Sequence, residues 1–103
     1  MAVAVSWAAG LTAELKAAGL TGCWWQGRSL YRWYLETRGT PYLAWLSVIP
    51  GCPMQVTYAV QRRDREPLPE VPDAMLAGLI AKSLKAAQVA QIFFELDSRE
   101  RRH

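Results

Sequence analysis

The residues of this chain best suited to chemistry are arginines interleaved with tryptophans and tyrosines between residues 23 and 45. The candidates are Trp24, Arg28, Arg32, Tyr34 and Trp45. These residue types anchor many protein interfaces because each brings a large contact area together with a polar group. Aromatic side chains on strands can also stack nucleotide bases while arginines contact phosphates. The pattern therefore predicts a binding surface made by these five residues.

Two classes of partner fit such a surface, and the charge pattern favours a protein. The formal net charge is only +3, and acids such as Asp64, Glu66 and Glu100 are mixed among the arginines. A surface that holds a phosphate backbone against salt needs a denser positive charge. We therefore predict a small non-catalytic protein-binding module: an inhibitor, adaptor or regulator that binds another protein or a second copy of itself. Single-stranded nucleic acid is the alternative partner.

The polar residues do not form a pattern typical of an enzyme or of a metal site. General acid–base catalysis needs a carboxylate or histidine held in a cleft, and the only histidine is His103 at the last position. Together with Cys23 and Cys52 it gives three nitrogen or sulfur ligands, fewer than the four of a typical structural zinc site. We expect no catalysis, no cofactor and no metal. Both cysteines are predicted to be free thiols, because two strand spacings separate them in a meander.

Length and composition predict one domain, residues 1–98, followed by a charged tail, residues 99–103. The chain has 103 residues, 51% of them hydrophobic and 20% charged, as in a globular protein. No apolar run is long enough to span a membrane, and residues 1–6 lack a positively charged leader, so a cytoplasmic location is expected. A composition rich in alanine, arginine and tryptophan without asparagine suggests a bacterial, phage or mobile-element origin. A small protein of that origin could act on host machinery.

The first element is predicted to be a helix. Trp7, Leu11 and Leu15 recur every four residues and would form one apolar stripe. Ser6 or Thr12 could cap its start. A glycine at position 19 is typical of the left-handed residue that ends many helices.

Strands of an antiparallel meander are expected at residues 22–26, 29–37, 42–49 and 55–61, joined by turns that contain glycine or proline. In the second, Tyr31, Trp33 and Leu35 would share one face, and Arg32, Tyr34 and Glu36 the other. Most single rings, among them Tyr31, Trp33, Trp45 and Tyr58, are expected to be core. The third strand is apolar on both sides, so one side must be covered by a helix, a dimer mate or a foreign partner. The functional question thus narrows to the second sheet face, around Arg32, Tyr34 and Trp45.

A second helix is predicted to begin near Pro72–Asp73 and to bury Leu76, Leu79, Ile80 and Leu84. Residues 88–96 could continue this helix or form a strand. The strand is favoured because residues 84–94 align without gaps onto residues 15–25, which read as a helix end followed by a strand. The expected fold is therefore α+β: an N-terminal helix, a three- to four-stranded antiparallel meander, a second helix and a C-terminal strand.

Overall fold

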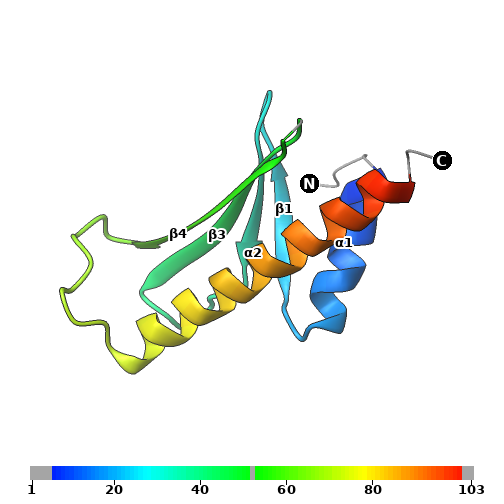
Figure 1. Ribbon diagram of the computed structural model, residues 1–103. Coiled ribbons are helices and arrows are strands. Elements are labelled where there is room, and N and C mark those ends of the chain that lie inside the picture. Colours follow the sequence, from blue (N-terminus) through cyan, green and yellow to red (C-terminus); the bar gives the residue numbers. More distant parts are fainter. Residues whose placement is uncertain (1–5, 52, 101–103) are drawn as a thin grey trace.

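The computed structural model describes residues 6–51 and 53–100 and shows an α+β fold. The elements are α1 (Ser6–Ala17), β1 (Gly22–Gln26), β2 (Tyr31–Leu35), β3 (Tyr42–Ile49), β4 (Gln55–Arg62) and α2 (Ala74–Glu100). The four strands form one antiparallel sheet in the order β1-β2-β3-β4. Both helices lie on the same face of this sheet (Figure 1). The predicted first helix, meander and second helix are confirmed.

Helix α1 begins at Ser6 and ends in a left-handed turn at Gly19. The N–H of Leu20 donates to the carbonyl oxygen of Leu15 at 3.0 Å, and Gly19 adopts a φ of 82°. This geometry is a Schellman motif, which favours glycine because it has no Cβ to clash. The role predicted for Gly19 is confirmed. Thr12 lies inside the helix and caps nothing, since its hydroxyl donates to the carbonyl of Ala8 at 2.6 Å.

The third strand buries one of its two apolar sides against the helices. Its buried residues are Tyr42, Ala44, Leu46 and Val48, whereas Leu43, Trp45 and Ser47 on the opposite side are partly exposed. The main core joins this side to Trp33 and Leu35 of β2 and to Leu11, Leu15, Ala86, Ala90 and Phe94 of the two helices. A smaller cluster of Tyr42, Leu76 and Leu79 seals the start of α2.

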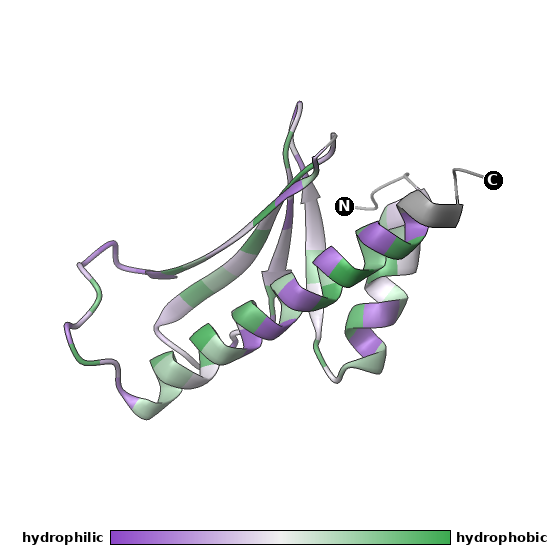
Figure 2. Ribbon diagram, viewed as in Figure 1, coloured by the Kyte–Doolittle hydropathy of each residue, from purple (hydrophilic) through white to green (hydrophobic). Residues whose placement is uncertain are grey.

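Helix α2 runs without a break through residues 88–96, so the predicted C-terminal strand is wrong. Ala90 and Phe94 are both buried at the helical spacing of four, whereas Ile92 and Leu96, placed with them on one strand face by the prediction, are exposed. Figure 2 shows apolar residues recurring along α2 with polar residues between them. Five of the nine residues at 88–96 are alanine, glutamine, glutamate or leucine, which are good helix formers. Leu84, predicted to be buried, is 42% exposed.

The sequence similarity between residues 15–25 and 84–94 has no structural counterpart. The first segment leaves its helix at Gly19, where a positive φ reverses the chain. The matching position in the second segment is Gln88, which has no such freedom and continues α2. The helix extends to Glu100, into the segment predicted as a tail, and residues 101–103 lie outside the described part of the chain.

Candidate functional site

No helix in the described part of the chain covers the sheet face opposite α1 and α2 (Figure 1). We call it the open face. Successive side chains of a strand point to opposite faces, so the pairing register fixes which residues share this open face. Two cross-strand rows form its middle: Trp25, Arg32, Ser47 and Thr57, and beside them Cys23, Tyr34, Trp45 and Ala59. The two rows place three aromatic rings around one arginine.

Arg32 lies between two indole rings. Its guanidinium carbon is 5.7 Å from the ring centroid of Trp25 and 5.2 Å from that of Trp45. Both distances are within the range of a cation–π interaction. Its Nη1 donates to the hydroxyl of Tyr34 at 3.1 Å, and the rings of Tyr34 and Trp45 are 5.8 Å apart. We call Trp25, Arg32, Tyr34 and Trp45 the aromatic box.

The aromatic box holds a positive charge without a counter-charge. Arg32 and Arg62 are the only charged residues in the four strands. Arg62 lies on the helix side and pairs with Asp64 at 2.9 Å, and its hydrogen bonds lower the pKa of that carboxyl to about 2. Among the described residues Arg32 has no ion pair, and its buried Nε has no hydrogen-bond partner. Arg32 is thus the one charged residue of the open face of the strands.

The structure brings three of the five predicted site residues together: Arg32, Tyr34 and Trp45. Trp24 lies on the covered face, where its indole N–H donates to the Thr12 hydroxyl at 2.6 Å. Its ring also meets the edge of Trp7 at 5.6 Å.

Arg28 lies exposed in the loop between β1 and β2, outside the aromatic box. Trp25, which pairs with Arg32, occupies the position predicted for Trp24. The available signal was register: Trp24 pairs with Trp33, so a core Trp33 requires a covered Trp24.

Tyr58, expected in the core, is 43% exposed on the helix side of the edge strand β4. Trp25 on the open face has the same exposed fraction. The two rings therefore offer comparable surface on opposite faces of one sheet.

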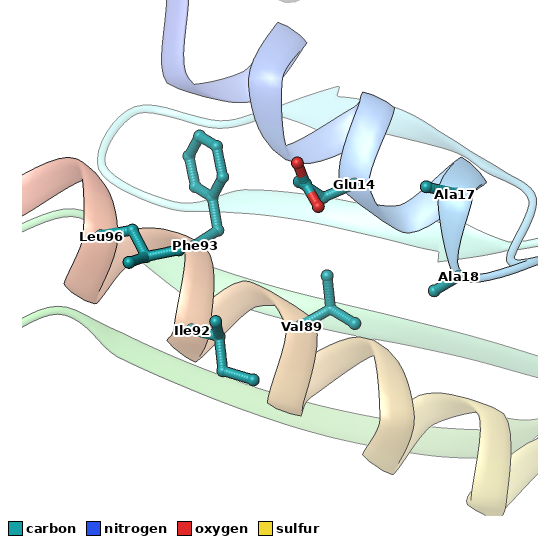
Figure 3. A pocket seen from close by; sticks show the side chains of 7 residues that line it. All are labelled: Glu14, Ala17, Ala18, Val89, Ile92, Phe93 and Leu96. Atoms are coloured by element: carbon teal, nitrogen blue, oxygen red, sulfur yellow. The ribbon is translucent and has the colours of Figure 1, made fainter.

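A groove lies between α1 and α2, apart from the open face of the sheet (Figure 3). It has a volume of about 350 Å³ and is lined by Glu14, Ala17, Ala18, Val89, Ile92, Phe93 and Leu96. The sequence did not predict this groove, because residues 88–96 were expected to form a strand and in α2 they supply four of its lining residues. Its lining is apolar apart from Glu14, so it gives little indication of the chemistry of a ligand.

Neither a metal-ligating cluster nor a membrane-spanning helix is found among the described residues. No group of three or more histidine, cysteine, aspartate or glutamate side chains among them could hold a metal ion. Cys23 is an exposed free thiol, and the prediction for Cys52 lies outside the described residues. Neither described helix has the length and apolarity needed to cross a membrane.

Comparison with family models, curated proteins and solved structures found no match to this chain.

Proposed function

We propose that this chain is a non-catalytic protein-binding module whose interface is the open face of the sheet. The observation that carries the proposal is the aromatic box on a face that no described helix covers. Tryptophan, tyrosine and arginine are the residues that most often dominate the binding energy of an interface, and they do so near its centre. Bound in this way, the module would act as an inhibitor, adaptor or regulator.

The charge on the open face supports a protein partner over nucleic acid. A single-stranded nucleic acid brings one negative charge per nucleotide, and its affinity rests on several cations along its path. The open face of the strands offers one arginine, and the other polar side chains on this face, such as Ser47, Thr57 and Gln61, are neutral. Exposed Trp25 and partly exposed Tyr34 keep nucleic acid as the second candidate, because bases stack on such rings.

Action in the cytoplasm and a bacterial or phage origin belong to the same proposal. Both are supported by composition alone.

Affinity capture from cells of the native source tests the protein-binding function. The wild-type chain should retain a stoichiometric partner, and Trp45→Ala or Tyr34→Ala should weaken retention by at least about tenfold, as expected for a central interface residue. Tyr58→Ala is the control, because it removes an exposed ring from the other face of the sheet. Equal retention by Trp45→Ala and the wild type would place the interface elsewhere.

A mobility-shift titration with a single-stranded oligonucleotide tests the alternative. A protein-binding module should give no shift at low salt. A shift that weakens steeply with added salt and disappears in the variant carrying both Arg32→Ala and Tyr34→Ala would favour the nucleic-acid reading.

A further inference from the structure

The aromatic box has the donors for a carboxylate but no carboxylate of its own. A guanidinium has five N–H donors, and within the described residues Arg32 uses one of them, to Tyr34. A partly buried cation gains most from an anionic group that brings charge and planar acceptors together. The strands contain no aspartate or glutamate, so an anionic group that binds Arg32 would come from outside the strands.

The segment between β4 and α2 has the complementary chemistry. Residues 63–73 are exposed throughout and project from the end of the sheet (Figure 1). They carry Glu66 and Glu70 on either side of an exposed Leu68, and Val71 is 82% exposed. The described structure shows no ion pair for either glutamate side chain.

Proline makes this segment a good ligand for an aromatic surface. Pro67, Pro69 and Pro72 fix φ and favour an extended chain, which lowers the entropy lost on binding. Extended proline-containing segments dock on surfaces lined with tryptophan and tyrosine. Each glutamate lies two residues from Leu68, roughly 7 Å along an extended chain. A glutamate on Arg32 would thus place Leu68 over one of the flanking indoles.

We propose that the open face binds residues 65–72 of a second copy of this chain, with the carboxylate of Glu66 or Glu70 on the guanidinium of Arg32. The inference rests on the proposed function in using the same face, and it names the occupant. Two copies can exchange their segments reciprocally, which gives a closed dimer. Such a dimer occupies the aromatic box, so a foreign partner must compete with the second copy.

Light scattering after size-exclusion chromatography, over a range of protein concentrations, tests the dimer. The wild-type chain should show a concentration-dependent monomer–dimer equilibrium. The Glu66→Gln, Glu70→Gln double variant should stay monomeric, and it leaves the box untouched. The Arg32→Met variant should also stay monomeric. Lys85 is an exposed charged residue on α2, so the Lys85→Met variant should dimerise as the wild type does.

A synthetic peptide of residues 64–73 tests the contact itself, with tryptophan fluorescence of the full chain as the readout. The peptide should bind the wild-type chain, and replacement of both its glutamates by glutamine should weaken binding by at least about tenfold, the loss expected for one charge-assisted pair. The Trp45→Ala chain should bind it comparably weakly. Circular dichroism spectra of the variants check that each remains folded.

Three results would overturn the inference. The first is a wild-type chain that stays monomeric at every concentration and does not bind the peptide. Another is a dimer that survives the double glutamine variant, which would place the contact on another surface such as the α1–α2 groove. The third is a Trp45-dependent complex with a foreign protein or an oligonucleotide, formed by a chain that does not bind the peptide. If the partner in that last case is a foreign protein, the inference fails but the proposed protein-binding function holds. If it is an oligonucleotide, both the inference and the proposed function are contradicted.

Discussion

Three arginines, Arg32, Arg62 and Arg63, have different roles because their side chains contact different groups. Arg63 fixes the β2–β3 turn by donating to the Thr37 hydroxyl at 2.8 Å and the Thr40 carbonyl at 3.1 Å. Arg62 is held by Asp64. Arg32 instead contacts two indole rings and the Tyr34 hydroxyl, and it has no ion pair among the described residues. The sequence alternation predicted the face of Arg32 but could not distinguish these three environments, because each depends on contacts between strands or turns.

Asp73 caps α2 and also fixes it to the sheet. Its Oδ1 accepts from the Leu76 N–H at 2.6 Å, and its Oδ2 accepts from the Tyr42 hydroxyl at 3.0 Å. Asp73→Ala should lower the free energy of unfolding by about 1–2 kcal/mol, because the cap is lost and a buried hydroxyl loses its partner. Asp73→Asn keeps a capping oxygen and should cost less. Urea denaturation measures both changes, and equal losses in the two variants would contradict this role.

Tyr42 should make the protein sensitive to alkali. Burial raises the pKa of its hydroxyl, and the hydrogen bond to Asp73 raises it further. The folded state therefore keeps the proton longer than the unfolded state does, and stability falls as the pH rises above about 10, where an unfolded tyrosine ionises. Thermal unfolding midpoints measured between neutral and alkaline pH should fall less in Tyr42→Phe than in the wild type. Parallel curves would show that Tyr42 does not contribute to the pH dependence.

At the scale of elements, the strands and α1 could be predicted from local pattern, and the second half of α2 could not. Side-chain types alternate along β2 and β4, which indicates strands, and Gly19 indicates the end of α1. Residues 88–96 fit both a period of two and a period of 3.6, since apolar residues follow each other closely there. Burial of Ala90 and Phe94 against the core decides for the helix, and that contact is tertiary.

Two glycines should respond oppositely to alanine, because their elements differ. A Cβ at Gly22 would clash with the Tyr34 carbonyl oxygen and lie 2.6 Å from the Trp33 ring, so Gly22→Ala must push β1 away from β2. We expect a loss of about 1–3 kcal/mol, typical of overpacking. Gly78 lies inside α2 with open space around it, so Gly78→Ala should gain about 0.5–1 kcal/mol from helix propensity. Urea denaturation that gave both variants the same sign would contradict this local geometry.

At the scale of the whole molecule, the structure has two layers, and the second layer covers only one side of the sheet. Both helices lie on that side, α1 against α2, within dimensions of 47 × 24 × 22 Å. The sequence indicated two apolar sides on the third strand but not where α1 would pack, since that depends on Trp7 meeting Trp24, Tyr31 and Phe94. The packing of α1 beside α2 leaves the aromatic box uncovered.

Site-specific photo-crosslinking tests most directly whether the open face is the interface. Thr57 and Tyr58 are neighbours in β4, both exposed, and their side chains point to opposite faces. A p-benzoylphenylalanine residue in place of Thr57 lies in the cross-strand row of Arg32, whereas in place of Tyr58 it lies on the helix side. The open-face interface predicts a discrete cross-linked adduct from position 57, in cells or with a second copy, and little or none from position 58. An adduct from position 58 alone, or from neither position, would contradict it.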